Sequence, residues 1–212
     1  RSTVYHLLTT LAAHGFVLHL REEQRWGLGT SAFELAGGYT RQQPLARLGR
    51  PLIAALSDRL GESAHLAVMS GGDVLYIVEE RAPRRPTLVT DVGVRLPAHL
   101  TASRRAMLAA LPREQVRALY PRASAFPDRT GLGPRRPAEL RELLREVRAR
   151  GYAVEDSEVA DGLRSVGAVV RDHTGWPIAA VAVTWGGEGH DERTLADAVI
   201  DTAGVLESRV KR

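Results

Sequence analysis

Apolar residues open the chain at the spacing of a helix, and polar residues fill the positions between them. The apolar stripe consists of Val4, Leu7, Leu8 and Leu11. It predicts a helix over Ser2–His14. Ser2 or Thr3 can cap its first turn, and Gly15 can end it because glycine tolerates left-handed torsions.

Two short strands are expected next, Phe16–Leu18 and Arg25–Leu28, joined by a polar hairpin tip over residues 21–24. A helix followed at once by such a hairpin is typical of the second half of a winged helix-turn-helix, whose helix enters the major groove of DNA. On the pattern alone, an ordinary amphipathic helix packed on a hairpin is the more common explanation. The winged-helix hypothesis assigns Arg25 to the wing and gives the helix these DNA-facing residues: Ser2, Thr3, Tyr5, His6 and Thr10.

Helical and strand patterns are interspersed along the rest of the chain. Helices are predicted over Ser31–Tyr39, Leu45–Leu60 (after Pro44), Thr101–Leu111, Pro112–Tyr120, Ala138–Arg150 and Glu192–Val210. Strands are predicted over His65–Met69, Val74–Val78, Leu88–Thr90, Tyr152–Glu155, Ser165–Arg171 and Ile178–Thr184. Short turns join several strands as hairpins, so the pattern predicts an antiparallel sheet with helices packed on it, the α+β class.

Composition narrows the range of functions. The 212 residues are 44% hydrophobic and 25% charged, as in a globular chain of one or two domains. Cysteine is absent, which excludes disulfides, thiol catalysis and cysteine-bound zinc. No apolar stretch reaches the ~20 residues that span a bilayer, and the start lacks the pattern of a signal peptide. A cytoplasmic protein without membrane contact is therefore expected.

Motifs of common catalytic sites are missing from the sequence. The seven His residues show no H-x-x-x-H spacing, and there is no G-x-S-x-G nucleophile elbow. The segment Gly186–Gly189 is rich in glycine but lacks the Lys-Ser/Thr of a phosphate loop. We therefore expect neither an enzyme nor a cofactor or metal site.

Charge is unevenly distributed along the chain. The formal net charge is +4, and every basic residue except Lys211 is Arg. Residues 81–150 contain sixteen Arg and six acidic residues, whereas residues 151–212 contain six basic and eleven acidic residues. The positive charge is concentrated in the middle of the chain, so the overall charge alone is a poor guide to the partners of the protein.

Several motifs, in order along the whole chain, resemble those of the IclR family of transcriptional regulators. They lie at Ser2–Leu8 with Leu11, Gly15–Phe16, Trp26–Gly29, Gly61–Val68, Leu96–Ala102, Arg150–Val154 and Gly162–Ala168. Each motif is moderately specific, and their shared order leaves little room for chance. In this family other helices precede the recognition helix. The chain begins at Arg1 without Met, so it is expected to lack the first part of that domain.

The resemblance implies a homodimeric or homotetrameric repressor or activator that binds double-stranded operator DNA and responds to a small molecule. Residues 1–30 would form the winged helix-turn-helix, residues 31–43 a linker helix, and residues 44–212 an effector-binding domain. That domain would contain a GAF/PAS-like antiparallel sheet flanked by helices, with a pocket for a small organic acid or an aromatic compound. The resemblance implies these effector contacts: Ala102, Ser103, Glu155, Ser165, Ala182 and Thr184.

The residue types at these positions suit a carboxylate ligand. A helix that opens at Thr101 presents unpaired amides and the positive end of its dipole, and nearby hydroxyls can hydrogen-bond the carboxylate oxygens. Apolar walls are expected from Leu75, Leu88, Val89 and Leu96. Without the resemblance, a serine in a strand is more often only a tolerated small residue.

Five positions depart from the residues that are usual in the family. Ser165 replaces a frequent Cys, Ala182 a frequent Ser and Glu155 the usual Asp, while Arg104-Arg105 stands where Gly-Lys is common. At least one of the two arginines is expected on a solvated helix face, and either is a candidate charge partner for the ligand. Glu155 would repel a plain anion, so the effector is expected to carry a hydroxyl as well as a carboxylate.

A second class of function is a GAF-like, small-molecule-sensing signalling domain that does not bind DNA. The helix and hairpin of the first thirty residues argue against it. The complete coding sequence would distinguish the two, because a regulator of this family needs two more helices before Arg1.

Overall fold

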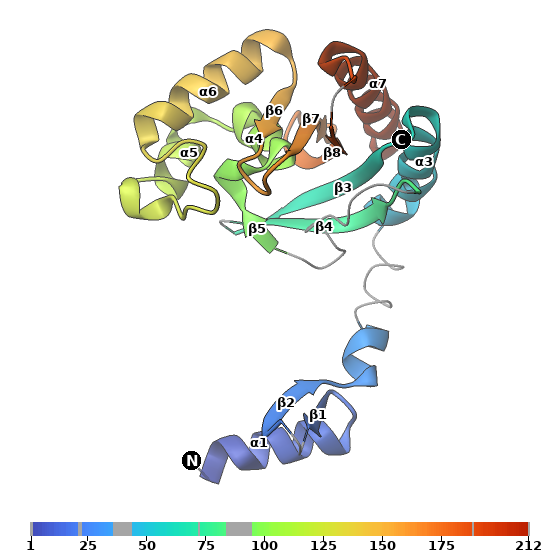
Figure 1. The fold of residues 1–212 in the computed structure, drawn as a ribbon, viewed down its shortest axis with the longest axis vertical. Coiled ribbons are helices and arrows are strands. Elements are labelled where there is room, and N and C mark those ends of the chain that lie inside the picture. The colour runs from blue at the N-terminus through green and yellow to red at the C-terminus, as the bar shows by residue number, and fades with distance from the viewer. Residues whose placement is uncertain are drawn as a thin grey trace. The chain divides into compact units, whose positions relative to one another are not determined.

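The computed structural model describes two compact units of the chain, Arg1–Arg47 and Leu48–Arg212 (Figure 1). The described residues are 2–20, 23–35, 44–71, 73–83, 95–187 and 189–211. None of their helices is long and apolar enough to cross a membrane. Three predicted features lie wholly or partly outside the described residues: the hairpin tip at 21–22, residues 36–43 of the linker helix, and the strand Leu88–Thr90.

The first unit contains a helix followed by a two-stranded antiparallel hairpin. Its elements are α1 (Ser2–Ala13), β1 (Val17–Leu20) and β2 (Arg25–Leu28), and residues 30–35 are helical. Gly15 ends α1 with a φ of 72°, and the amide of Phe16 donates to the carbonyl of Leu11. This is the glycine-terminated helix end that the sequence predicts.

The second unit is built on a six-stranded antiparallel sheet with the strand order β5-β4-β3-β8-β7-β6. Two hairpins, β3–β4 and β7–β8, lie next to each other, so strands from distant parts of the chain pair at the centre. The strands are β3 (Ser63–Ser70), β4 (Asp73–Glu80), β5 (Arg95–Pro97), β6 (Ala153–Asp156), β7 (Leu163–Arg171) and β8 (Pro177–Gly186). The three-residue β5 was not predicted, because it is too short to show alternation.

Helices flank the sheet, and their capping residues fix several of their ends. They are α3 (Pro44–Leu60), α4 (Ala102–Ala110), α5 (Arg113–Leu119), α6 (Pro137–Arg150) and α7 (Glu192–Val210). The Thr101 side chain caps α4 by accepting from the Arg104 amide at 3.2 Å. Asp191 caps α7, and Gly151 ends α6 with a φ of 86°.

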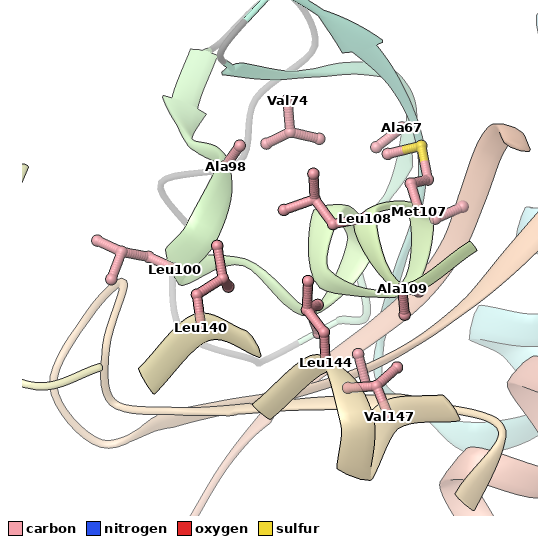
Figure 2. Close-up of a cluster of buried hydrophobic side chains, with 14 of the residues drawn as sticks. Ala67, Val74, Ala98, Leu100, Met107, Leu108, Ala109, Leu140, Leu144 and Val147 are labelled. Atoms are coloured by element: carbon pink, nitrogen blue, oxygen red, sulfur yellow. The ribbon is translucent and has the colours of Figure 1, made fainter. Parts of the chain in front are cut away.

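The two faces of the sheet are covered by different helices (Figure 1). On one face, Gly49 of α3 lies so close to Leu66 of β3 that a side chain at Gly49 would collide with it. On the other face, α4 packs against β7 and β8, and α6 packs on α4. The large apolar cluster lies on this second side, where Figure 2 shows Leu108 of α4, Leu144 of α6 and Val74 of β4 gathered together. The α+β class and the antiparallel sheet are thus confirmed.

Candidate functional site

Polar side chains from three neighbouring strands form a row on the face of the sheet that α4 covers. In the antiparallel register, Glu155 of β6 lies opposite Ser165 of β7, and Ser165 lies opposite Thr184 of β8. Alternate residues of a strand share a face, so the neighbouring row contains Gly167 of β7, Ala182 of β8 and His65 of β3. Strand pairing thereby gathers residues that are distant in the sequence.

The N-terminus of α4 rests on the second of these rows. Gly167 permits the close approach, since a Cβ there would come within 2.9 Å of the carbonyl carbon of Ala102 and 3.0 Å of the nitrogen of Ser103. The first amides of a helix have no intrahelical acceptors and carry the positive end of its dipole. The missing side chain at Gly167 thus brings a donor-rich helix end against the polar face of the sheet.

A small cavity lies between this helix end and the sheet. Its volume is about 20 Å³, enough for about one water molecule, whereas pockets for drug-sized ligands measure ~300–1,000 Å³. No group of three or more potential metal ligands gathers there or elsewhere among the described residues. The cavity is lined by all six residues that the resemblance assigns to effector binding: Ala102, Ser103, Glu155, Ser165, Ala182 and Thr184.

A continuous chain of hydrogen bonds runs through the polar row. The Ser165 hydroxyl donates to Glu155 Oε2 at 2.9 Å, and the hydroxyl oxygens of Ser165 and Thr184 lie 2.9 Å apart. While Glu155 is ionised, Ser165 gives its one proton to the carboxylate, so Thr184 then donates to Ser165. Burial raises the pKa of Glu155 to about 7, although hydrogen bonds from the Val159 amide and from Ser165 oppose the rise. The carboxyl group therefore changes its protonation state near neutral pH.

His65 and Tyr76 also line the cavity, and the sequence analysis did not assign them to it. His65 is buried, and neither ring nitrogen bonds to any residue in the described part of the chain. Burial lowers the pKa of His65 to about 3, so the ring is neutral and offers one unused donor and one unused acceptor. The Tyr76 phenol interacts with the hydroxyls of Ser103 and Thr101. Alternation along β3, which turns His65 to the inward face, is the signal that could have identified it.

The loop Ser157–Gly162, here called the cover loop, joins β6 to β7 and contributes Val159 to the wall of the cavity. Glu158 fastens this loop to α4, because its carboxylate makes two hydrogen bonds of 2.8 Å with the Arg105 guanidinium. The Glu158 amide also donates to Glu155 Oε1 at 2.9 Å. The size of the cavity therefore depends on where the cover loop lies.

The expectations for the two arginines of α4 are wrong. Arg104 and Arg105 are each 1% exposed, so neither lies on a solvated face, and neither lines the cavity. Arg104 donates to the carbonyls of Gly71 and Asp73 at 2.8 and 3.1 Å. Arg105 donates to two further backbone carbonyls in addition to Glu158. Because α4 lies between the sheet and α6, both guanidinium groups reach into neighbouring segments of the protein and donate to acceptors there.

Two of the four residues predicted to form apolar walls lie in the described part of the chain, and neither lines the cavity. Leu75 does not line the cavity, because its neighbour Tyr76 occupies the face of β4 that does. Leu96 is buried in the apolar cluster instead of the cavity, while Leu88 and Val89 lie outside the described residues. Apart from Ala102 and Ala182, the aliphatic lining comes from the cover loop and the start of β7: Val159, Ala160 and Leu163.

The first unit exposes side chains that the winged-helix hypothesis assigns to DNA binding. Thr3, Tyr5 and His6 are exposed on α1, and Arg25 is exposed at the start of β2. Ser2 is the first residue of α1. The apolar stripe of the helix is also exposed, with Leu7 at 60%. Within this unit, α1 is therefore accessible along both its polar and its apolar sides.

Comparison with known proteins finds transcriptional regulators. The family described as "Bacterial transcriptional regulator IclR C-terminal" matches residues 37–204. The Transcriptional repressor IclR of Escherichia coli (strain K12) is 30% identical over 187 residues, which cover 86% of this chain and 67% of that protein. The HTH-type transcriptional regulator BhcR of Paracoccus denitrificans (strain Pd 1222) is 32% identical over 210 residues, which cover 97% of this chain and 74% of that protein.

A solved structure shares the fold. It is the crystal structure of an IclR homolog complexed with 4-hydroxybenzoate from Microbacterium hydrocarbonoxydans. Its TM-score is 0.80 at 20% identity, and the match covers 99% of this chain and 85% of that one. The alternative of a sensing domain that does not bind DNA receives no support from these similarities.

Proposed function

The chain belongs to the IclR family of bacterial transcriptional regulators, and we propose that it binds operator DNA through its first unit and a small hydroxy acid in the cavity beneath α4. The choice of effector rests on one observation. A helix N-terminus, a buried carboxyl group with its hydroxyl partners, and a histidine with two unused nitrogens all border the same cavity.

The groups around the cavity favour a ligand that combines an anionic group with a hydroxyl. The first amides of α4 and the neutral ring of His65 supply donors for a carboxylate. Glu155 supplies an acceptor for a hydroxyl, and it would repel a plain anion when ionised. The 4-hydroxybenzoate bound by the Microbacterium homolog has this combination of groups. We therefore infer that the effector is a hydroxy acid of similar size.

Such a ligand requires the cavity to enlarge. A volume of about 20 Å³ is far below the ~300 Å³ at the lower end of ligand pockets. The cover loop forms part of the cavity wall, and the ion pair between Glu158 and Arg105 attaches this loop to α4. We expect the effector to displace this loop while α4 and the sheet stay in place.

Operator recognition is assigned to α1. Thr3, Tyr5 and His6 are the candidates for contacts with base edges, and Ser2 and Arg25 are additional contacts with the DNA. The match to an HTH-type regulator over 97% of this chain supports the assignment. Two copies of α1 related by a two-fold axis would read a pseudo-palindromic operator, so we expect a homodimer or a homotetramer. We also expect a cytoplasmic protein without enzymatic activity.

The proposal is tested in two steps. The purified protein first selects its site from a random library of duplex DNA, and fluorescence anisotropy then measures the Kd for that site with and without 4-hydroxybenzoate. We expect a pseudo-palindromic consensus and a Kd that changes when the ligand is saturating. A consensus without two-fold symmetry would contradict the DNA assignment. A Kd that no member of a panel of hydroxy acids changes would contradict the effector assignment.

A further inference from the structure

A second concave site lies between α5 and α6, with a volume of about 520 Å³. Two rows of arginine line it. The row on α5 is spaced by one helical turn, and the row on α6 extends over two turns. Together the rows comprise Arg113, Arg117, Arg141, Arg145 and Arg148. We call this site the arginine groove. It belongs to the positively charged middle of the chain, which the proposed function leaves unexplained.

The positive charge of the arginine groove is largely uncompensated. Glu142 is the one acidic residue among the described residues that line it, and it pairs with Arg145. Arg113, Arg117 and Arg141 form no ion pair or hydrogen bond within the described part of the chain. Arginines on a protein surface are commonly paired or spread apart, whereas these converge on one hollow. The groove thus presents several free guanidinium groups to one ligand.

Arg148 lies close enough to Arg113 for the two positive charges to affect each other. Its Nε donates to the carbonyl of Ala109, near the end of α4, at 2.7 Å. Burial lowers the pKa of Arg148, and the nearby charge of Arg113 lowers it further. Two like charges without an acid between them repel each other, and an anion placed between them would relieve the repulsion.

The floor of the groove is apolar. Val116, Leu140 and Leu144 line it while they are buried in the core, and Figure 2 shows Leu140 and Leu144 on the side of α6 that meets α4. The volume falls within the ~300–1,000 Å³ of small-molecule sites. Guanidinium groups bind phosphate through paired hydrogen bonds, which makes arginine the preferred residue for phosphate recognition. We propose that the arginine groove binds a small molecule with two or more phosphate groups and an aromatic or apolar part, as in a nucleoside polyphosphate.

The limited volume and the apolar floor favour such a molecule over duplex DNA, whose backbone would present phosphates to the arginines but no apolar group to the floor. The phosphates would lie against the two rows of arginine, and the aromatic part would cover Leu140 and Leu144. The site is separate from the cavity beneath α4, because no residue lines both.

Calorimetric titration of the chain at physiological ionic strength tests the proposal, with ATP, inorganic tripolyphosphate and adenosine as probes. We expect ATP to bind more tightly than tripolyphosphate, and adenosine not to bind. The double substitution Arg113→Gln/Arg117→Gln should weaken ATP binding by at least about tenfold, equivalent to about 1.4 kcal/mol. The matched control is Arg122→Gln, which removes an exposed arginine outside the groove and should leave ATP binding unchanged.

Three results would overturn the proposal. The first is the absence of ATP binding, and the second is binding that the double substitution does not weaken. The third is a double variant that loses affinity for short duplex DNA but retains it for ATP, because the arginines would then contact DNA. Thermal melting of each variant shows whether it is folded, and the operator assay reports separately on the proposed function.

Discussion

Replacing Glu158 with alanine should destabilise the second unit far more than most changes of an acidic surface residue. The side chains of Arg105 and Glu158 are 2% and 13% exposed, so the substitution leaves a buried positive charge without its counter-ion. Breaking a buried pair in this way costs about 3–5 kcal/mol. Arg105 keeps its bonds to the carbonyls of His99 and Val154, so we expect the lower end of this range.

The matched control is Glu142→Ala, which removes the partner of Arg145 from an exposed pair. Exposed ion pairs contribute about 0–1 kcal/mol. Urea unfolding, followed by tryptophan fluorescence to which Trp185 buried in β8 contributes, gives the free energy of unfolding of each variant. Equal losses in Glu158→Ala and Glu142→Ala would refute the reasoning, because the buried guanidinium would then not depend on its carboxylate.

Three further sets of substitutions test other parts of the molecule. Gly167→Ala should lower the free energy of unfolding by about 1–3 kcal/mol, because its Cβ would meet the backbone of α4 at 2.9 Å; Gly204→Ala, with nothing within 4 Å, should be neutral or stabilising. Glu155→Gln should remove a pH dependence, since the pKa of Glu155 is about 7 when folded and 4.5 ordinarily. Because the folded state binds this proton more tightly, it is stabilised by about 3 kcal/mol below pH 4.5. This stabilisation is lost as the pH rises to 7. Thr3→Ala/His6→Ala should weaken operator binding by about 1–3 kcal/mol for each lost base contact.

Each of these expectations has an outcome that contradicts it. Equal stability of the two glycine variants would show that α4 does not rest on β7. For Glu155, the informative quantity is the difference between the parent and Glu155→Gln in urea unfolding. The lowered pKa values of His65 and His99 change stability in the opposite direction over part of the same range. A difference that stays constant from pH 4.5 to 7 would mean that Glu155 ionises normally. An unchanged anisotropy titration would show that α1 is not the reading helix.

Local residues made several element boundaries predictable. Asp191 caps α7, and the helix spans Glu192–Val210 in both the prediction and the structure. Gly15 and Gly151 take positive φ values at the helix ends where the sequence predicts them. These features depend on the backbone and on side chains a few residues away, so this single sequence is enough to predict them.

Contacts between distant segments were not predictable in the same way. The acceptors of Arg104 lie 31 and 33 residues away, and Glu158 lies 53 residues from Arg105. A helical pattern shows which residues share a side of α4, but it does not show that neighbouring segments cover every side. For the same reason the small size of the cavity, part of whose wall is the cover loop, was not foreseen.

The six cavity positions came from the family resemblance, and their meeting in one place depends on the register of three strands. Strand alternation shows that Ser165 and Gly167 share a face, but only the pairing with β6 and β8 places Glu155 and Thr184 beside Ser165. Alternation along β3 can place His65 on the inward face, but the pairing of β3 with β8, which brings His65 beside Ala182, is not specified by any local pattern.

We propose that the cavity beneath α4 holds the effector. The most direct test of this proposal is calorimetric titration of the parent, Ser165→Phe and Ser208→Phe with 4-hydroxybenzoate and a panel of related hydroxy acids. Ser208 is exposed on α7, so its substitution is the matched control. We expect the tightest-binding acid to bind the parent and Ser208→Phe equally and to lose measurable binding to a folded Ser165→Phe. Unchanged affinity in Ser165→Phe, or binding of neutral apolar compounds alone, would show that the effector does not bind in this cavity.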